Sequence, residues 1–188
     1  LQKAQKKYFE KSFADAIKLQ HYNDISEVKL QNAFIVANEI FDAFPCELVY
    51  TSQKGQLQYA TVQNHTIEFE DLYDTHLIEH CKKYQITKGE IAVGYETFAK
   101  TLANNIEKFD FISFDYGERY PRNDFSCRVY EKHSVYPIFE ENLDLKKLYQ
   151  NSDITYDVHF DHLIESFENT GVKKIDYTTQ LKALVDFG

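Results

Sequence analysis

Two apolar segments of strand length organise the hydrophobic pattern of this chain. Residues 33–37 read AFIVA without alternation, and residues 109–114 read FDFISF after a long amphipathic stretch. An unbroken apolar run such as residues 33–37 is typical of a strand in a parallel sheet that helices cover on both faces, and residues 109–114 are a second apolar-rich segment of strand length. We therefore expect a strand at residues 33–37 that is buried on both faces, and a second buried strand at residues 109–114.

Helical periodicity surrounds these strands. Apolar residues recur every three or four positions in five segments, which predicts helices at residues 1–19, 71–84, 91–108, 160–168 and 181–187. The clearest apolar stripe belongs to the third of these segments and is formed by Ile91, Tyr95, Phe98, Ala99, Leu102, Ala103 and Ile106. This helix runs directly into the second buried strand, as expected of an α/β unit.

The stretch that follows the first buried strand has a different pattern. Residues 47–51, 56–62 and 66–69 are rich in β-forming residues, and turn signals separate them at Lys54-Gly55 and Asn64-His65. They predict an antiparallel hairpin or three-stranded meander, inserted at residues 46–70.

The remaining segments complete a mixed pattern. Residues 153–158 and 172–177 are predicted to be strands, whereas residues 117–150 show little periodicity and are predicted to form a loop or lid. The order of elements predicts one α/β domain over residues 1–188. Because the chain starts on a helix that leads into a strand, we expect its sheet to lack the first strands.

Composition narrows the classes of function. A chain of 188 residues with 43% hydrophobic residues can bury the core of one domain. The net charge of −9, with no basic run, argues against a nucleic-acid partner, and no apolar stretch is long enough to span a membrane. The three cysteines are odd in number and widely spaced, so we expect free thiols in a reducing compartment.

Polar side chains follow both buried strands. Asn38, Glu39 and Asp42 come after the first strand, and Asp115 and Tyr116 come after the second. In open α/β sheets, ligands bind beyond the carboxyl ends of the strands, so these residues form a candidate site. The alternatives are that Asn38 and Asp42 cap a turn or a helix, and that Asp115 marks a plain exit from strand to loop.

A second candidate chemistry lies in the helix predicted at residues 71–84. His76, Glu79 and His80 match the H-x-x-E-H pattern of one class of zinc protease, in which two histidines bind zinc and the glutamate acts as the base. A zinc hydrolase is therefore an alternative function. Since histidine and glutamate are common on solvated helix faces, a plain surface helix is the favoured interpretation, with no metal bound.

Several stretches, taken together, resemble the MidA-type family of S-adenosylmethionine-dependent methyltransferases, which includes the mitochondrial complex I assembly methyltransferase. VANEIFDAFPCE at residues 36–47 resembles the signature after the family's fourth strand, with matches at Asn38, Glu39, Asp42 and Pro45. The other similar stretches are LQKAQKKYF at 1–9, FISFDYG at 111–117, the loop residues Ser126, Arg128, Tyr130 and His133, ITYDVHF at 154–160, and the ending from Thr179-Gln180 to Gly188. These matches follow the family's order along nearly the whole chain.

The resemblance implies a Rossmann-like class I methyltransferase fold that binds S-adenosyl-L-methionine. It also implies methyl transfer to an arginine of a partner protein, as in the assembly of respiratory complex I. A carboxylate can grip a guanidinium with two hydrogen bonds and orient one nitrogen, and Glu39 is our first choice for this catalytic role, with Asp42 second. Asn38 is expected nearest the cofactor, and the acceptor pocket is expected to include Asp115, Tyr116 and His133.

The chain also departs from the family pattern. The family's glycine-rich cofactor loop, and the acidic residue that holds the cofactor ribose, lie upstream of the region that resembles this chain. His159 stands where the family usually has an aspartate. We therefore expect an N-terminally truncated domain that is inactive on its own, and a non-catalytic binding or assembly module is the alternative. The implied location is the cytoplasm for a bacterial protein and the mitochondrial matrix for a eukaryotic one.

Overall fold

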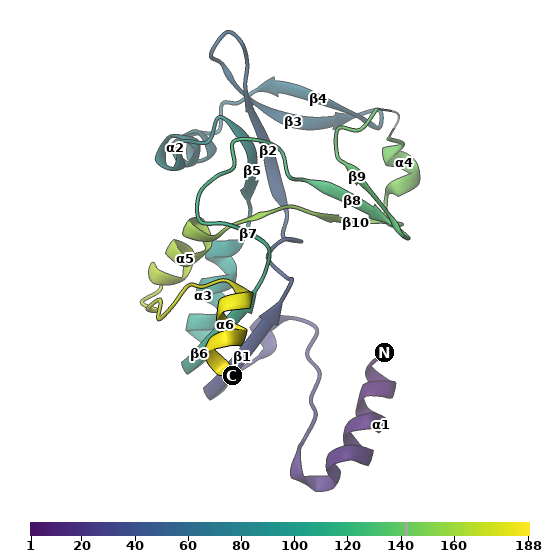
Figure 1. The fold of residues 1–188 in the computed structure, drawn as a ribbon, viewed down its shortest axis with the longest axis vertical. Coiled ribbons are helices and arrows are strands. Elements are labelled where there is room, and N and C mark those ends of the chain that lie inside the picture. The colour runs from purple at the N-terminus through teal and green to yellow at the C-terminus, as the bar shows by residue number, and fades with distance from the viewer. Residues whose placement is uncertain (142) are drawn as a thin grey trace.

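The computed structural model describes residues 1–141 and 143–188 and shows a mixed α/β architecture (Figure 1). The two predicted buried strands are β1 (Leu30–Asn38) and β6 (Ile106–Phe114), and they pair in parallel. The register places Ala33 opposite Phe109 and Asn38 opposite Phe114, so both strands end at the same edge. The α/β class and the parallel pairing of these strands are confirmed.

One face of the parallel pair is open in this chain, which corrects the prediction of burial on both faces. Phe34 and Val36 of β1 are 67% and 60% exposed, and Ile112 of β6 is 40% exposed. The opposite face packs on the core through residues such as Ala33 and Phe109. An apolar run does not distinguish these outcomes, because it reports only that the side chains are apolar on both faces.

The predicted meander is confirmed, but it is part of a larger antiparallel sheet. The strand order is β4-β3-β2-β5. The elements are β2 (Cys46–Thr51), β3 (Leu57–Gln63), β4 (Thr66–Asp71), α2 (Thr75–Tyr84) and β5 (Lys88–Ala92). Helix α2 begins at Asp74, whose carboxylate accepts hydrogen bonds from the main-chain N–H of His76 and Leu77. The insert therefore extends to residue 92.

Strand β5 was not predicted from the sequence: its last two residues, Ile91 and Ala92, were assigned to the following helix, and residues 88–90 were assigned to no element. That helix, α3, spans Tyr95–Asn105, which is shorter at both ends than the predicted residues 91–108. Ile91 lies in β5, buried beneath the antiparallel sheet, and Gly94 separates strand from helix with a φ of 110°. The apolar stripe of the helix continued by coincidence into the neighbouring strands, so periodicity alone placed its ends too far out.

The segment predicted as a loop or lid contains short regular elements. Three strands form an antiparallel sheet in the order β10-β8-β9, and β11 pairs in parallel with β7. The elements are β7 (Gly117–Glu118), β8 (Arg128–Glu131), β9 (Ser134–Pro137), α4 (Leu145–Leu148), β10 (Asp153–Thr155) and β11 (Val158–His159). Helix α5 (Phe160–Glu168) follows, as predicted.

The two terminal regions make few contacts with the core. The predicted first helix ends early: α1 spans Gln2–Phe13, short 3-10 turns follow at Ala14–Ala16 and Ile25–Glu27, and Figure 1 shows α1 apart from the sheets. Residues 172–177 form no strand, which corrects the prediction there, since they pair with no other strand in the described part of the chain. The last helix is α6 (Gln180–Phe187).

The main core is aromatic and surrounds Phe41, whose side chain is fully buried. The Phe41 ring lies edge-on against Tyr95 and Phe98 of α3, with centroids 5.4 and 5.5 Å apart. Phe167 of α5 approaches it from another side. The core thus fixes the chain just after β1, where the candidate site begins. Among the described residues, no helix combines the length and apolarity needed to cross a membrane.

Candidate functional site

The carboxyl ends of β1 and β6 bring together the polar residues that the sequence singled out. Both strands end side by side, and the N–H of Glu39 donates to the carbonyl of Phe114 at 2.8 Å, which extends the pairing by one residue. Asn38, Glu39 and Asp42 therefore lie beside Asp115 and Tyr116. This is the sheet edge at which an open α/β fold binds its ligands.

Asp115 anchors the turn after β1. Its Oδ2 accepts hydrogen bonds from the N–H of Phe41 at 2.9 Å and of Asp42 at 3.4 Å, and its Oδ1 accepts from the N–H of Tyr116 at 3.0 Å. Burial raises the pKa of Asp115, and these backbone hydrogen bonds partly oppose the rise. Because both oxygens are engaged by the main chain, Asp115 holds the site together and is poorly placed to grip a substrate.

Asp42 has the least satisfied side chain of the site. It is only 2% exposed, and its Oδ1 has no hydrogen-bond partner in the described part of the chain. Burial raises its pKa, and the nearby carboxylates of Asp115 and Glu39 raise it further. A buried carboxyl with a free oxygen and acidic neighbours is costly unless it is protonated or meets a cation. Oδ1 of Asp42 accepts no hydrogen bond from a turn or a helix end in the described residues, so the alternative that Asp42 is a cap does not explain this oxygen.

Glu39 and Tyr116 form the outer side of the site. Glu39 is exposed and has a φ of 50°, a left-handed conformation that a non-glycine residue adopts at some cost. Burial and the adjacent Glu39 carboxylate together raise the pKa of Tyr116 to about 12. Glu39 is thus exposed at this edge whereas Asp42 is buried, and the catalytic role of Glu39 stays a prediction.

Among the described residues, the side-chain amide of Asn38 is the clearest candidate for a contact with the cofactor. It is exposed at the end of β1, and its amide makes no side-chain hydrogen bond among the described residues. A free amide can both donate and accept, which suits a nucleoside or an amino-acid group. The chain thus fits one edge of S-adenosyl-L-methionine, and its six glycines include no G-x-G loop to hold the rest.

Gly117 allows two segments to meet beneath the site. The N–H of Val158 donates to the carbonyl of Tyr116 at 2.8 Å, where β11 runs beside β7. A Cβ built on Gly117, at φ +156°, would lie 2.0 Å from the carbonyl oxygen of Val158. Glycine is needed here because two main chains approach closely.

His133 is separate from the other predicted residues. It is exposed in the turn between β8 and β9, and no hydrogen bond or ion pair in the described ranges joins it to the acids at the ends of β1 and β6. The structure therefore does not bring it into this site. Its role in the acceptor pocket stays a prediction.

Sequence reasoning missed two acids, Glu90 and Asp157, whose hydrogen bonds hold the segment around Ser126. Glu90 of β5 is largely buried and accepts from the N–H groups of Ser126 and Cys127, both at 2.8 Å, and from the Ser126 hydroxyl at 3.1 Å. Ser126 in turn accepts from the N–H of Asp157 at 2.8 Å, and Arg128 pairs with the Asp157 carboxylate. The signal for Glu90 was its place directly before the apolar residues Ile91 and Ala92, but residues 88–90 were assigned to no element.

The arrangement of His76, Glu79 and His80 does not support the zinc alternative. His76 and Glu79 are exposed on α2, whereas the ring of His80 packs between Tyr84 and His162, with centroids 4.7 and 4.3 Å away. Over residues 1–141 and 143–188, no group of three or more histidine, cysteine or acidic side chains is arranged to hold a metal ion.

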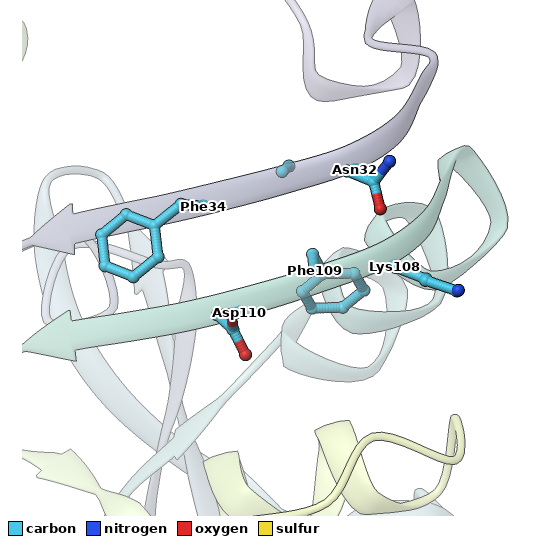
Figure 2. Close-up of a pocket in the computed structure, with 6 residues that line it drawn as sticks. Asn32, Phe34, Lys108, Phe109 and Asp110 are labelled. Carbon is cyan, nitrogen blue, oxygen red and sulfur yellow. The ribbon is translucent and has the colours of Figure 1, made fainter.

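A pocket lies elsewhere on the parallel pair. It has a volume of about 340 Å³ and lies on β1 and β6 toward their starts (Figure 2). Its lining is Asn32, Ala33, Phe34, Lys108, Phe109 and Asp110. None of the candidate site residues lines it, and it holds no unsatisfied buried polar group. Size alone does not make it the site, so the acids at the strand ends remain the candidate.

Comparisons with known proteins show the family and the fold of this chain. Residues 1–178 match a protein family described as "Putative S-adenosyl-L-methionine-dependent methyltransferase". A COG1565 superfamily member from Burkholderia thailandensis, bound to S-adenosyl-homocysteine, is similar over 100% of the chain, with 17% identity and a TM-score of 0.78. A second COG1565 superfamily protein from the same organism gives 17% identity over 100% of the chain and a TM-score of 0.71. No curated protein sequence matches the chain.

Because their identity to this chain is only 17%, the two solved structures support the fold alone. The chain spans 50% and 52% of their lengths, so it corresponds to about half of each. The family match is broader evidence because it extends over residues 1–178. The protein therefore belongs to the family with that description, whose cofactor is S-adenosyl-L-methionine.

Proposed function

We propose that this chain carries the acceptor side of an S-adenosyl-L-methionine-dependent methyltransferase that acts on an arginine of a partner protein. The family supports the transferase class and the cofactor. The arginine acceptor rests on one observation, the buried Asp42 carboxyl whose Oδ1 lacks a partner beside two other acids. We further propose that β1 and β6 belong to a Rossmann-like sheet of the MidA type.

A guanidinium group has the positive charge and the N–H donors that complement this site. It is planar, stays protonated in water and presents five N–H donors, so it can supply both a charge and a hydrogen bond to the free oxygen of Asp42. Glu39 lies on the outer side, where its exposed carboxylate can attract the same cation. The two acids divide recognition: Asp42 orients the guanidinium, and Glu39 guides it inward.

The chain's own groups would prepare the acceptor for reaction. When bound, S-adenosyl-L-methionine supplies a methyl group on a sulfonium sulfur, and Asn38 would contact its edge nearest β1. Asp42 holds one guanidinium nitrogen in line with that methyl group and stabilises the cation as charge redistributes. As the new N–C bond forms and the S–C bond breaks, the nitrogen loses a proton, for which the Glu39 carboxylate is a nearby acceptor. The aromatic wall around Phe41 limits the access of water from the core side.

The test compares single-residue variants of the full-length protein. Asp42→Asn should reduce transfer of labelled methyl groups to an arginine peptide by about 100-fold or more, which corresponds to about 2.7 kcal/mol. Glu39→Gln should reduce it by about tenfold, because an exposed charge contributes less. Cofactor affinity, measured on the same samples, should change little in either variant.

Glu68→Gln is the matched control, since Glu68 is an exposed acid on β4 and lies at the end of neither β1 nor β6. Its transfer rate should equal that of the wild type. A subunit of respiratory complex I is the partner to test first, because the MidA resemblance points to it. Near wild-type transfer by Asp42→Asn, or transfer to a lysine peptide in place of the arginine peptide, would refute the proposed acceptor.

A further inference from the structure

The turn that carries Asp42 is held from two sides. On one side, the N–H groups of Phe41 and Asp42 donate to the Asp115 carboxylate. On the other, the carbonyl of Phe41 accepts a hydrogen bond of 2.9 Å from the hydroxyl of Tyr95. Asp115 comes from β6 and Tyr95 from the first turn of α3, so two elements distant in sequence grip the same peptide unit.

Tyr95 is built into the core at this point. Its side chain is fully buried, and its ring packs edge-on against Phe41 and Phe44, with centroids 5.4 and 5.2 Å away. Its hydroxyl also lies 3.4 Å from that of Tyr156, and the N–H of Tyr156 donates to the carbonyl of Asp42 at 3.0 Å. The carbonyls of both Phe41 and Asp42 are therefore satisfied from below, which leaves the Asp42 side chain as the group without a full set of partners.

We propose that Tyr95 is a positioning residue for the methyl acceptor: its hydroxyl fixes the Phe41 carbonyl and so keeps the Asp42 carboxyl buried and free to meet the guanidinium. This inference rests on the proposed function. Without the hydroxyl, the buried Phe41 carbonyl would keep only its longer hydrogen bond, 3.3 Å from the N–H of Phe44, and losing the shorter bond has a free-energy cost. The turn can relieve that cost by shifting until water reaches the carbonyl. Water would then also reach Asp42, and the acceptor would lose its fixed partner.

The experiment uses Tyr95→Phe in the full-length protein, which keeps the ring and removes only the hydroxyl. Hydrogen exchange of the amides of Phe41, Asp42 and Tyr156 should be faster by at least tenfold, because the turn opens more often. The kcat for an arginine peptide should fall about ten- to hundredfold, since a small misplacement of a positioned group has a large effect on rate.

The pH profile distinguishes positioning from a general loss of stability. In the wild type, burial and acidic neighbours raise the pKa of Asp42, so the acid limb of methyl transfer should lie above the range of an ordinary aspartate. In Tyr95→Phe, hydration of Asp42 should lower that pKa and move the limb to lower pH. Destabilisation alone would reduce the amount of active enzyme and leave the limb in place.

Tyr84→Phe is the matched control, because it also removes a partly buried phenol that donates a hydrogen bond, here to Glu165 of α5. It should change neither the exchange of the turn nor the acid limb. Unchanged exchange at Phe41 and Asp42 in Tyr95→Phe would overturn the role of Tyr95, whether or not the enzyme methylates arginine. Faster exchange in a protein whose wild type never methylates arginine would refute the proposed acceptor and confine Tyr95 to holding the turn.

Discussion

At the residue scale, the three acids at the strand ends have three different tasks although they are chemically alike. Asp115 has both oxygens bonded to main-chain N–H groups, Asp42 keeps one buried oxygen free, and Glu39 is exposed. The differences come from where the backbone turns after β1. A folded protein with a buried charge that lacks a partner should be less stable than a variant without that charge. The trade-off between stability and activity can therefore be measured.

Asp42→Asn should leave the unliganded protein as stable as the wild type at pH 7 or more stable, by up to about 1 kcal/mol, or about 2–4 °C in Tm. The substitution removes a buried charge that two neighbouring carboxylates repel. The folded state raises the pKa of Asp42, so it binds a proton more tightly than the unfolded state does. Its contribution to stability is therefore present at low pH and is lost as the pH rises through the raised pKa.

Urea unfolding of both proteins as a function of pH checks this prediction. The gain in Asp42→Asn should grow as the pH rises and vanish below the pKa of an unfolded aspartate, about 3.9. A large loss of stability at neutral pH would show that the Asp42 carboxylate is already well paired in the folded protein.

Gly117→Ala should destabilise the protein by at least about 2 kcal/mol, because the new methyl group would meet the Val158 carbonyl and force β7 and β11 apart. Denaturant unfolding measures the change. Gly55→Ala is the control: it carries the same methyl group at a positive φ of 79°, but a Cβ there meets nothing within 4 Å. The loss of unfolding free energy in Gly117→Ala should exceed that in Gly55→Ala, which reports the backbone strain alone. Equal losses would mean that the close approach of the chains is unimportant.

At the scale of elements, titratable side chains join α2 to α5 and α3. The rings of His80, His159 and His162 lie within 4.3 to 6.3 Å of a neighbour in this cluster, and His162 bonds to Glu96 at 2.7 Å. The groups that face His80 and His159 are Lys83 and Tyr84 of α2, Glu96 of α3, the main chain of Arg119, and Asp161, His162 and Glu165 of α5. This junction attaches the antiparallel sheet to the rest of the fold.

The junction should weaken in acid. Burial, together with the charge of His162, lowers the pKa of both His80 and His159 to about 4, below the value of about 6.5 in an unfolded chain. The unfolded state then binds more protons, so the stability from this cluster is fully present above pH 6.5 and is lost as the pH falls toward 4. For partly exposed rings we expect about 1–2 kcal/mol over this range.

His80→Phe should remove part of that pH dependence, and His76→Phe should not, because His76 is exposed on the same helix. Unfolding in urea between pH 4 and 7 measures both variants. Identical slopes of stability against pH for the wild type and His80→Phe would contradict the assignment of acid sensitivity to this junction.

At the scale of the whole molecule, the chain presents an open sheet face and a cluster of acids at one end of it. Phe34, Val36 and Ile112 are exposed on the parallel pair, and Asp42 and Asp115 lie together beyond its carboxyl end. The sequence contains no G-x-G motif, and the chain spans 50% and 52% of the two related structures.

Residues 1–188 by themselves should therefore bind S-adenosyl-L-methionine weakly, since Asn38 contributes few contacts, and should show no measurable methyl transfer. Calorimetry on this polypeptide, compared with the full-length protein, measures the difference. The full-length protein should bind at least about 100-fold more tightly, or about 2.7 kcal/mol. Similar affinities for the two would show that the cofactor site lies within the 188 residues.

The sequence by itself determined the elements whose formation depends on local pattern. The runs at β1 and β6, the polar residues after them, the turns of the meander and the helix α5 could all be predicted, because the type of a strand, turn or amphipathic helix is recorded in its local residue pattern. The resemblance in residues 36–47 and 111–117 also pointed to the same strand ends.

Only the tertiary structure decided which of the polar residues are functional neighbours. Glu39 ranked first by sequence, yet the fold exposes it and buries Asp42, and Tyr95 reaches the same turn from 54 positions away. β5 and the unpaired residues 172–177 were misassigned for a similar reason, since a strand exists only where another strand accepts its hydrogen bonds. Burial, pKa and hydrogen-bond partners depend on contacts between distant segments, and no local pattern records them.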